Sequence, residues 1–310
     1  MGIDVSRDRY ALVGNPVAHS RSPQIHAAFA RQTGQPIDYA LMLAPIDPPG
    51  AFEAQVRAFF AAGGKGMNVT VPFKQRALAL ASELSPRARA ARALNTLALD
   101  GARLIGENTD GAGLLADLLD NLGGHADGLR DARVLLIGAG GAARGVVLPL
   151  LEAGVSQITI ANRTLARAQV IAADLAPLIP PRAAAPSARP ASGSGSMRLR
   201  AIGLVELNQG AVDADIVINA TSAGLKAGGA ALVLSPTVFS CCRLACDMVY
   251  GAEPTAFLRA AQEAGAVRVV DGLGMLVGQA ADSFALWRGV RPDTAPVLAA
   301  LRETLRRADS

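Results

Sequence analysis

The stretch Val134-Leu-Leu-Ile-Gly138-Ala-Gly140-Gly141-Ala-Ala-Arg144 joins an apolar run to a glycine-rich turn. Residues 142–153 then have helical apolar spacing, and residues 157–160 predict a second strand. Strand, G-x-G-x-x-A turn, helix and strand in this order are typical of a dinucleotide-binding unit. Gly138 permits the tight turn, Gly140 lets the backbone approach a pyrophosphate, and the helix N-terminus offers N–H groups to that anion. The sequence predicts a parallel α/β sheet carrying a nucleotide here, and a glycine-rich turn without a ligand is the alternative.

The second strand of this unit ends at Ala-Asn162-Arg163-Thr164-Leu-Ala-Arg167. Enzymes that use NAD place an Asp or Glu about 20 residues beyond the first glycine, on the ribose 2′-hydroxyl. No carboxylate stands near that position. Arg163 and Arg167 lie one helical turn apart, so their guanidinium groups can converge on a 2′-phosphate. We therefore expect NADP(H) rather than NAD(H), and a solvated basic helix start is the alternative.

The first hundred residues alternate between strand-like and helix-like runs, which favours a further parallel α/β sheet. We expect strands at 10–13, 37–43 and 67–71 and helices at 23–32, 52–62 and 75–84. Asp100-Gly101 between apolar pairs predicts a hairpin turn. A leucine stripe then predicts a helix over 109–122, and helices are also expected from about 272 to 288 and from 294 onward.

A length of 310 residues suggests two domains. Residues 176–196 contain five prolines and four serines without periodicity, which predicts a flexible surface insertion. The longest uncharged stretch, residues 227–242, is too short and too interrupted for a membrane span, so no membrane association is expected.

Composition narrows the class of protein further. Four charges in the first nine residues replace the apolar core of a secretory signal, and three crowded cysteines indicate a reduced compartment. We expect a cytoplasmic protein. A net charge of +4 with only 4% aromatic residues lacks the basic stripe and stacking platforms of a nucleic-acid binder. A small anionic ligand accounts for the charge better, and no nucleic-acid partner is expected.

Two polar segments stand apart from the nucleotide motif. Ser20 and Ser22 follow the first strand, where Ser22 before Pro23 is a helix N-cap candidate and Ser20 is not explained by capping. In Met67-Asn68-Val-Thr70-Val-Pro-Phe-Lys74 the strand period places Asn68 and Thr70 on one face. Lys74 follows at the turn and, taken alone, is a solvated charge.

Eight ordered motifs give these segments a common context, and with them the chain resembles the shikimate dehydrogenase family. They are GNPVAHSRSP from Gly14, NVTVPFK from Asn68, NTDG from Asn108, GAGGAARG from Gly138, NRT from Asn162, NATSAG from Asn219, DMVYG from Asp247 and DGLGMLVGQA from Asp271. The resemblance covers nearly the whole chain except the insertion. It implies an N-terminal α/β substrate-binding domain (1–108 and 273–310), a Rossmann-type doubly wound NADP-binding domain (109–272), and C-terminal helices that return to the first domain.

The resemblance also implies a reaction and a role for each site residue. The reaction is the reversible NADPH-dependent reduction of 3-dehydroshikimate to shikimate, in the pathway to chorismate and aromatic amino acids. Lys74 and Asp110 are implied as the acid–base pair. The implied substrate ligands are Ser20, Ser22 and Tyr250 for the carboxylate, and Asn68, Thr70, Asn95 and Gln279 for the ring hydroxyls. The implied cofactor ligands are Gly138, Ala139, Gly140, Gly141, Ala142, Asn162, Arg163, Thr164 and Arg167, with Thr221, Met248, Gly272 and Met275 near the nicotinamide.

Some alternatives stay open at this stage. One is a quinate/shikimate dehydrogenase paralogue with broader substrate and cofactor use, and another is a non-catalytic NADPH-binding regulator. The retained lysine–aspartate pair argues against the regulator, and the motifs give no support to the similarly built methylenetetrahydrofolate dehydrogenases. Arg92 stands where the family usually has glycine. No metal site is expected, the cysteines are expected to be inert, and a homodimer is kept as an alternative because the sequence does not set the oligomeric state.

Overall fold

The computed structural model describes residues 7–125, 127–179, 198–210, 212–221 and 232–308. The chain divides into two compact units, residues 1–113 with 276–301 and residues 114–275 with 302–310. The division falls inside three helices, α4 (Asp110–Asn121), α9 (Leu273–Arg288) and α10 (Ala295–Ala308). No helix in the described ranges combines the length and apolar character needed to cross a membrane.

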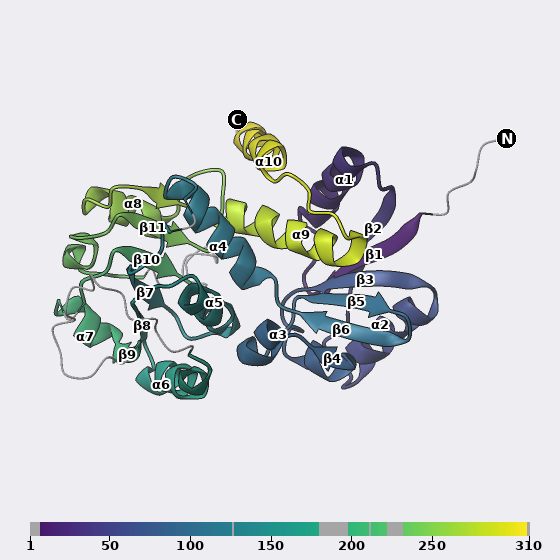
Figure 1. Ribbon diagram of the computed structural model, residues 1–310, viewed down its shortest axis with the longest axis horizontal. Coiled ribbons are helices and arrows are strands. Elements are labelled where there is room, and N and C mark those ends of the chain that lie inside the picture. The colour runs from purple at the N-terminus through teal and green to yellow at the C-terminus, as the bar shows by residue number, and fades with distance from the viewer. Residues whose placement is uncertain (1–6, 126, 180–197, 211, 222–231, 309–310) are drawn as a thin grey trace. The chain divides into compact units, whose positions relative to one another are not determined.

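The first unit contains a mixed six-stranded sheet in the order β2-β1-β3-β5-β6-β4 (Figure 1). Its strands are β1 (Asp8–Gly14), β2 (Ile37–Leu43), β3 (Gly64–Val69), β4 (Glu83–Leu84), β5 (Thr96–Asp100) and β6 (Arg103–Glu107). Its other helices are α1 (Ser22–Thr33), α2 (Ala51–Ala61), α3 (Pro86–Ala91) and the first residues of α10 (Ala295–Ala308). The β5–β6 hairpin is confirmed: Asp100 pairs with Arg103, and Gly101 has φ +61°.

The parallel pairing expected for the first strands is confirmed, because β1 runs parallel to both β2 and β3. The predicted hairpin adds β5, which runs antiparallel to β3 and β6. One expectation for this unit was wrong. Residues 75–84 do not form one helix but a 3₁₀ turn, Arg76–Leu80, followed by β4. The backbone N–H groups of Ser82 and Ser85 donate to carbonyls of β6, so pairing with a strand about 20 residues later overrides the local helical period.

Arg92 ends α3 in the left-handed conformation, with φ +48°. That conformation is the one in which helices commonly place glycine after their last turn. Arg92 stands where the family usually has glycine, and the end of α3 nevertheless has its usual geometry. Arg92 N–H donates to the Arg89 carbonyl at 3.2 Å.

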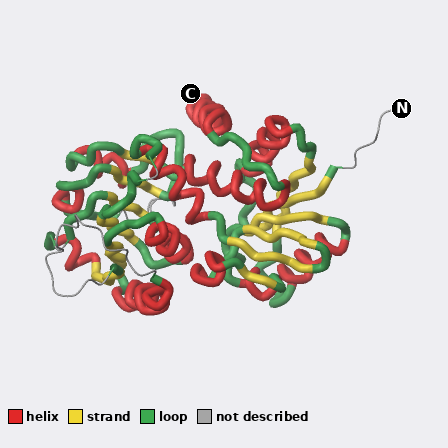
Figure 2. The backbone as a smooth tube through the Cα atoms, in the orientation of Figure 1, coloured by secondary structure: helices red, strands yellow, loops and turns green. Residues whose placement is uncertain are grey.

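The second unit contains six parallel strands in the order β12-β11-β10-β7-β8-β9, the Rossmann order. Figure 2 shows the strands of both units in yellow and the helices in red. Its strands are β7 (Arg133–Ile137), β8 (Gln157–Asn162), β9 (Leu199–Gly203), β10 (Ile216–Asn219), β11 (Leu244–Asp247) and β12 (Val269–Val270), and its helices include α5 (Gly141–Glu152), α6 (Leu165–Leu175), α7 (Leu204–Asn208) and α8 (Ala256–Glu263). The predicted dinucleotide-binding unit is thus confirmed as β7-α5-β8. Of the expected insertion, Ala176–Leu178 forms a 3₁₀ turn, and residues 180–196 lie outside the described residues.

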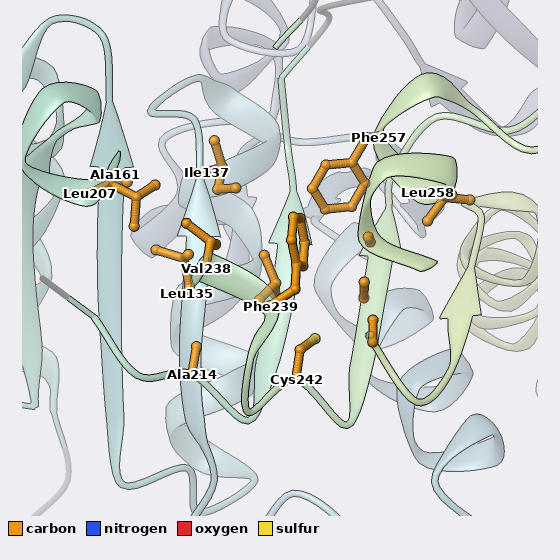
Figure 3. Close-up of a cluster of buried hydrophobic side chains, with 14 of the residues drawn as sticks. Leu135, Ile137, Ala161, Leu207, Ala214, Val238, Phe239, Cys242, Phe257 and Leu258 are labelled. Atoms are coloured by element: carbon orange, nitrogen blue, oxygen red, sulfur yellow. The ribbon is translucent and has the colours of Figure 1, made fainter. Parts of the chain in front are cut away.

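One face of this second sheet is covered by a closed apolar core (Figure 3). Leu135 and Ile137 of β7 are fully buried there, and Phe239 meets Phe257 edge to face with ring centroids 5.7 Å apart. Buried aromatic and aliphatic area of this kind stabilises a domain by roughly 1.5–3 kcal/mol per side chain. This packing holds the parallel strands side by side, so their carboxyl ends lie next to one another at the same edge of the sheet. Cys242 and Cys246 are buried, and burial raises the pKa of both thiols, which agrees with unreactive cysteines.

Candidate active site

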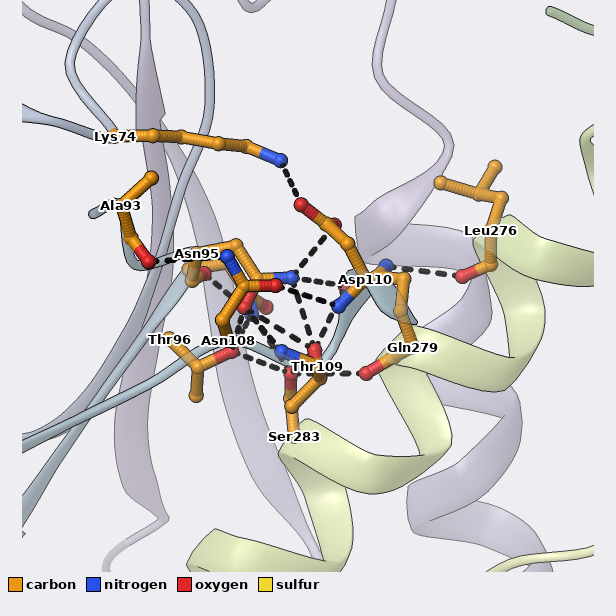
Figure 4. A network of polar contacts seen from close by, with 11 residues as sticks. Lys74, Ala93, Asn95, Thr96, Asn108, Thr109, Asp110, Leu276, Gln279 and Ser283 are labelled. Carbon is orange, nitrogen blue, oxygen red and sulfur yellow. Dashed lines mark hydrogen bonds and ion pairs between the residues drawn. The ribbon is translucent and has the colours of Figure 1, made fainter. Parts of the chain in front are cut away.

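A lysine–aspartate ion pair lies at the edge of a polar network in the first unit (Figure 4). Lys74 Nζ donates to Asp110 Oδ2 at 2.6 Å, and the lysine and aspartate side chains are 30% and 11% exposed. The second carboxylate oxygen, Asp110 Oδ1, accepts from Asn95 Nδ2 at 2.9 Å. The carboxylate is therefore held from both sides, while an ammonium with three donors retains hydrogens for a ligand oxygen.

The backbone around Lys74 is fixed by its neighbours. The turn that precedes it closes with Phe73 N–H donating to the Thr70 carbonyl, and the Phe73 ring stacks on Phe52 with centroids 4.3 Å apart. The Lys74 carbonyl accepts from Leu94 N–H at 3.0 Å. A buried aromatic anchor beside the lysine restricts where its ammonium can lie.

Asp110 is the first residue of α4, and the preceding Asn108 accepts its backbone N–H through Oδ1 at 3.2 Å. Negative charge at a helix N-terminus is favoured by the free N–H groups and the helix dipole. Local sequence therefore explains both the helix start and the carboxyl group placed there.

Asn95, only 3% exposed, links Asp110 to Gln279 of α9. Its Nδ2 donates to Asp110, to Thr109 Oγ1 at 2.9 Å and to Gln279 Oε1 at 3.2 Å, while its Oδ1 accepts from Thr109 N–H at 2.8 Å. The structure thus brings four predicted site residues, Lys74, Asp110, Asn95 and Gln279, into one network.

Asn68, on β3, belongs to the same network and is 5% exposed. Its Nδ2 donates to the Asn95 carbonyl at 3.2 Å, to Thr96 Oγ1 at 3.1 Å and to Ser283 Oγ at 3.0 Å. Thr70 is two residues further along and lies against the end of β1, where a Cβ on Gly14 would be 2.3 Å from its methyl group. The expected alternation on β3 is present, because Met67 and Val69 face the apolar core instead.

The two predicted serines contact each other. Ser20 Oγ donates to Ser22 Oγ at 3.1 Å and accepts Ser22 N–H at 3.2 Å. The interpretation of Ser22 as an N-cap was wrong: α1 begins at Ser22, and no side chain caps it. Ser20 instead takes up a free N–H at the helix start, which leaves the Ser22 hydroxyl available for another partner.

The glycine turn after β7 has the geometry that a pyrophosphate needs. Gly138 has φ +115°, and a Cβ there would be 3.0 Å from the Ala220 carbonyl oxygen, so only glycine fits. At Gly140 and Gly141 an added Cβ would meet nothing within 4 Å, so open space lies over the start of α5. No acidic residue occupies the first turn of α5. An exposed helix N-terminus without a carboxylate fits the diphosphate of a dinucleotide.

The end of β8 is basic and exposed. Asn162 Nδ2 donates to the Thr164 carbonyl at 2.9 Å and shapes the turn into α6. Arg163 and Arg167 are exposed and form no ion pair with any described residue. Two exposed guanidinium groups at the end of β8 are suited to a 2′-phosphate, and this role stays a prediction.

The residues expected near the nicotinamide occupy neighbouring strand ends of the second unit. Asn219 is the last residue of β10. Its side-chain Oδ1 accepts from Thr221 Oγ1 at 2.7 Å, and its backbone carbonyl accepts from Met248 N–H at 3.0 Å. A Cβ on Gly272 would be 2.3 Å from the Met248 carbonyl oxygen, so glycine is required there too. Met275 N–H donates to Asp117 Oδ2 at 3.1 Å. Tyr250 follows β11 in this unit, and its role on the substrate carboxylate stays a prediction.

Sequence reasoning missed several members of the network in the first unit. Thr96 and Ser283 share a 2.8 Å hydrogen bond, and both lie beside Asn68. Ser283 is one helical turn after Gln279, so helical spacing could have indicated it. Tyr39, which donates to Asn68 Oδ1 at 2.7 Å, carries no such signal in its strand. Within the described ranges, no three His, Cys, Asp or Glu residues are grouped as metal ligands.

Family models of three domains match the chain in sequence order. They are the shikimate dehydrogenase substrate binding domain over residues 12–97, shikimate/quinate 5-dehydrogenase over residues 122–182, and the shikimate 5′-dehydrogenase C-terminal domain over residues 272–302.

Curated relatives and solved structures agree with these models. A protein of Aromatoleum aromaticum named shikimate dehydrogenase (NADP(+)) is 52% identical, over 96% of this chain and 98% of its own length. One of Alkalilimnicola ehrlichii with the same name is 49% identical, over 95% and 98%. A crystal structure of shikimate 5-dehydrogenase from Thermus thermophilus, in complex with NADP(H) and shikimate, is 33% identical with a TM-score of 0.76, covering 96% of this chain and all of that one.

The Rossmann unit and the lysine–aspartate network define the class of protein, a dinucleotide-dependent oxidoreductase with a separate substrate-binding unit. Within that class, the chain belongs to the shikimate dehydrogenase family.

Proposed function

We propose that this protein is an NADP-dependent shikimate dehydrogenase, which reversibly reduces the ring ketone of 3-dehydroshikimate to the hydroxyl of shikimate. The observation that carries the proposal is the 2.6 Å contact between Lys74 Nζ and Asp110 Oδ2, in a network that leaves the ammonium partly exposed. A protein that only bound the cofactor would have no need for that pair.

The chemistry follows from where charge develops. When bound, NADPH supplies the hydride that adds to the ketone carbon. The ketone oxygen gains negative charge as this happens, and a proton donor within hydrogen-bond reach lowers the barrier. Lys74 gives that proton, and Asp110 holds the ammonium in place through Oδ2 while Asn95 holds Oδ1. In the oxidation of shikimate, Lys74 accepts the hydroxyl proton.

The remaining polar residues recognise the substrate. The hydroxyls of Ser20 and Ser22, together with Tyr250, bind its carboxylate. The ring hydroxyls are held by the polar side chains of the first unit, namely Asn68, Thr70, Asn95 and Gln279. Mutual hydrogen bonds among these amides support the assignment, because a ligand meets groups that are already oriented.

The cofactor binds along the strand ends of the second unit. The backbone from Gly138 to Ala142 takes the diphosphate, and Asn162, Arg163, Thr164 and Arg167 take the adenosine phosphate. Thr221, Met248, Gly272 and Met275 border the nicotinamide. Open space over Gly140 and the exposed arginine pair support this arrangement.

Initial rates from nicotinamide absorbance test the function. Four assays cross shikimate and quinate with NADP⁺ and NAD⁺. Turnover confined to shikimate with NADP⁺ is expected. Comparable rates with quinate or NAD⁺ would assign the protein to the broader paralogue, and cofactor binding without turnover in all four assays would favour a regulator.

Arg163→Ala tests the choice of cofactor. We expect the Kd for NADP⁺ to rise by about tenfold or more, because a charge-assisted hydrogen bond to phosphate contributes roughly 1.5–3 kcal/mol. The Kd for NAD⁺ should stay within about twofold, because NAD⁺ lacks the 2′-phosphate. Titration calorimetry with both cofactors measures the two constants, and Arg87→Ala, at an exposed arginine of α3, serves as the matched control. Equal losses for the two cofactors would show that Arg163 contacts no 2′-phosphate.

Three broader expectations accompany this function. The substrate-binding domain comprises residues 1–108 and 273–310, and the NADP-binding domain comprises residues 109–272. The enzyme acts in the cytoplasm on a small molecule.

The oligomeric state is a separate question. Sedimentation velocity of the purified protein distinguishes a monomer from a homodimer.

A further inference from the structure

Two polar side chains are buried next to each other at the ends of β10 and β11, and the proposed reaction gives neither of them a task. Asn219 and Asp247 are register partners in this parallel pair of strands, and they are 0% and 1% exposed. Asn219 Nδ2 donates to Asp247 Oδ1 at 3.0 Å. Burying polar groups costs free energy unless they are hydrogen-bonded, so the other bonds of this pair show what it holds in place.

Each side chain of the pair accepts the backbone N–H group two residues further along the chain. Asn219 Oδ1 accepts from Thr221 N–H at 3.1 Å, and Asp247 Oδ1 accepts from Val249 N–H at 3.1 Å. Both strands therefore leave the sheet through the same kind of turn, in which an Asn or Asp side chain replaces a backbone acceptor. Because Asn219 also donates to Asp247, the two turns are linked directly to each other.

The turn after β10 lies against the glycine turn after β7. Ala220 N–H donates to the Ile137 carbonyl at 2.8 Å. A Cβ on Gly138 would be 3.0 Å from the Ala220 carbonyl oxygen and 3.1 Å from the Thr221 methyl group. The place of Thr221 is therefore set relative to the backbone that is suited to a diphosphate.

The turn after β11 is anchored to α8 and to Gly272. The second carboxyl oxygen, Asp247 Oδ2, accepts from Thr255 Oγ1 at 2.6 Å. Thr255 Oγ1 in turn caps α8 by accepting Leu258 N–H at 3.3 Å. The Val249 carbonyl accepts from Gly272 N–H at 3.1 Å. The Asp247 carboxyl group thus joins the start of a helix to the turn that contacts Gly272.

We propose that Asn219 and Asp247 are positioning residues for hydride transfer, which hold the nicotinamide end of the cofactor site at a set place relative to the diphosphate turn. This inference rests on the proposed function, in which Thr221, Met248 and Gly272 border the nicotinamide. Thr221 is held by Asn219, and Met248 directly follows Asp247 in its turn. Hydride transfer needs the two reacting carbons close together and aligned, and a displacement of about 1 Å can cost about a hundredfold in rate.

Asp247→Ala and Asp247→Asn in the full-length enzyme form a matched pair at one position. Alanine removes the link to Asn219 and the acceptor of Val249 N–H. Asparagine keeps both, because its oxygen takes the place of Oδ1 while its NH₂ group donates to Thr255 Oγ1, a hydroxyl that also accepts.

The rate constant of a single turnover measures the hydride-transfer step. At saturating NADP⁺ and shikimate, we expect NADPH formation to be about tenfold to a hundredfold slower in Asp247→Ala. In Asp247→Asn the rate constant should stay within about threefold of the wild type, because each hydrogen bond keeps a partner. Stopped-flow absorbance of the nicotinamide gives both values.

Two readouts separate positioning from a loss of stability. Partial unfolding lowers the amplitude of the single turnover because fewer molecules react, but it leaves the rate constant of the folded molecules unchanged. Adenosine 2′,5′-bisphosphate carries the 2′-phosphate and lacks the nicotinamide. Its Kd, measured by titration calorimetry, should stay within about twofold in both variants, because the glycine turn and the arginines are intact.

Asn219→Ala breaks the same link from the other side and keeps the test open if Asp247→Ala does not fold. It should slow the single turnover about as much. The double variant Asn219→Ala/Asp247→Ala should be much faster than the product of the two effects predicts, because residues that act through one contact are not additive. Phe239→Leu, in the apolar core of the same unit, should lower stability and leave the rate constant unchanged.

Three results would overturn the inference. They are a wild-type rate constant in the alanine variants that fold, an Asp247→Asn enzyme as slow as Asp247→Ala, and a Kd for adenosine 2′,5′-bisphosphate that rises as much as the rate falls. If the wild-type protein oxidises shikimate and one of these results is found, only the role of the pair is refuted. If the wild-type protein does not turn over shikimate, the proposed function is refuted, and the role of the pair with it.

Discussion

Lys74→Ala should lower kcat for shikimate oxidation by about 10²–10⁴-fold, the range over which a positioned acid–base group accelerates a reaction. The Kd for NADP⁺ should change by less than about twofold, because Lys74 belongs to the first unit and the glycine turn to the second. Removing the amine leaves Asp110 Oδ2 without its 2.6 Å partner, and the hydroxyl proton released in the oxidation must then pass to water. Initial rates at saturating substrate, with cofactor binding measured in parallel, give both quantities.

The matched control for this variant is Lys65→Ala, at an exposed lysine of β3 nine positions earlier. It should leave kcat unchanged. Asp110→Asn should lie between the two lysine variants, because the amide keeps the shape and the bond from Asn95 but loses the charge that holds the ammonium. A Lys74→Ala enzyme with wild-type kcat would remove Lys74 from the chemistry.

The second large effect concerns stability in acid and arises at His26. This histidine is buried in α1 among Tyr39, Phe29, Phe284 and Trp287, and its two ring nitrogens have no hydrogen-bond partner within the described ranges that meets normal geometry. Burial lowers the pKa of His26 from 6.5 to about 3, while the neighbouring Asn68 side chain opposes that shift. The native state therefore holds the imidazole neutral across most of the acid range.

The sign of the effect follows from linkage. The unfolded chain takes up a proton on His26 below its pKa of 6.5, whereas the native state does so only near pH 3. The stability contribution is thus complete above pH 6.5 and is lost as the pH falls from 6.5 towards 3. The loss is about 2 kcal/mol by pH 5 and roughly 4–5 kcal/mol by pH 3, at about 1.4 kcal/mol per pKa unit.

His26→Phe isolates this contribution because it keeps an aromatic ring in the cluster and removes the titrating group. Urea denaturation at pH 7 and pH 5 should show the variant losing about 2 kcal/mol less than the wild type over that interval. The exposed His125→Gln serves as the control and should follow the wild type. Identical pH dependence in wild type and His26→Phe would show that His26 titrates normally in the native state.

A variant comparison is needed because a second buried group titrates in the opposite sense. Burial raises the pKa of Asp117 to about 7, and the neighbouring charges of Asp271 and Asp120 add to that shift while Arg302 opposes it. Its carboxylate is unfavourable when ionised, so the native state gains stability as the pH falls through 7 towards the ordinary value of 3.8. The two effects partly cancel in the wild type and separate only when one group is removed.

Local pattern was sufficient for much of this fold. The glycine turn at Gly138, the hairpin at Asp100-Gly101 and the leucine stripe of α4 each depend on residues within a few positions of one another, where backbone sterics and helical period act directly. The roles of Lys74 and Asp110 have a different origin, because they were implied by the resemblance of their motifs to a known family and stay a proposal.

Other features depended on partners far away in the chain. Residues 75–84 have a helical period, yet their end pairs with β6 as β4. Tyr39 and Asn68 are 29 positions apart, yet the Tyr39 hydroxyl donates to Asn68 Oδ1 at 2.7 Å. Asn68 and Ser283 are 215 positions apart in the chain, yet Asn68 Nδ2 donates to Ser283 Oγ at 3.0 Å.

The amino-acid sequence alone therefore determined the fold class and the cofactor motif, because each is written in contiguous residues with their own conformational preference. Only the tertiary structure decided which buried polar groups meet, and so revealed Tyr39 and His26. The orientation of an amide and the protonation of a buried imidazole are set by the atoms packed around them, and those atoms come from strands and helices that are distant in the chain.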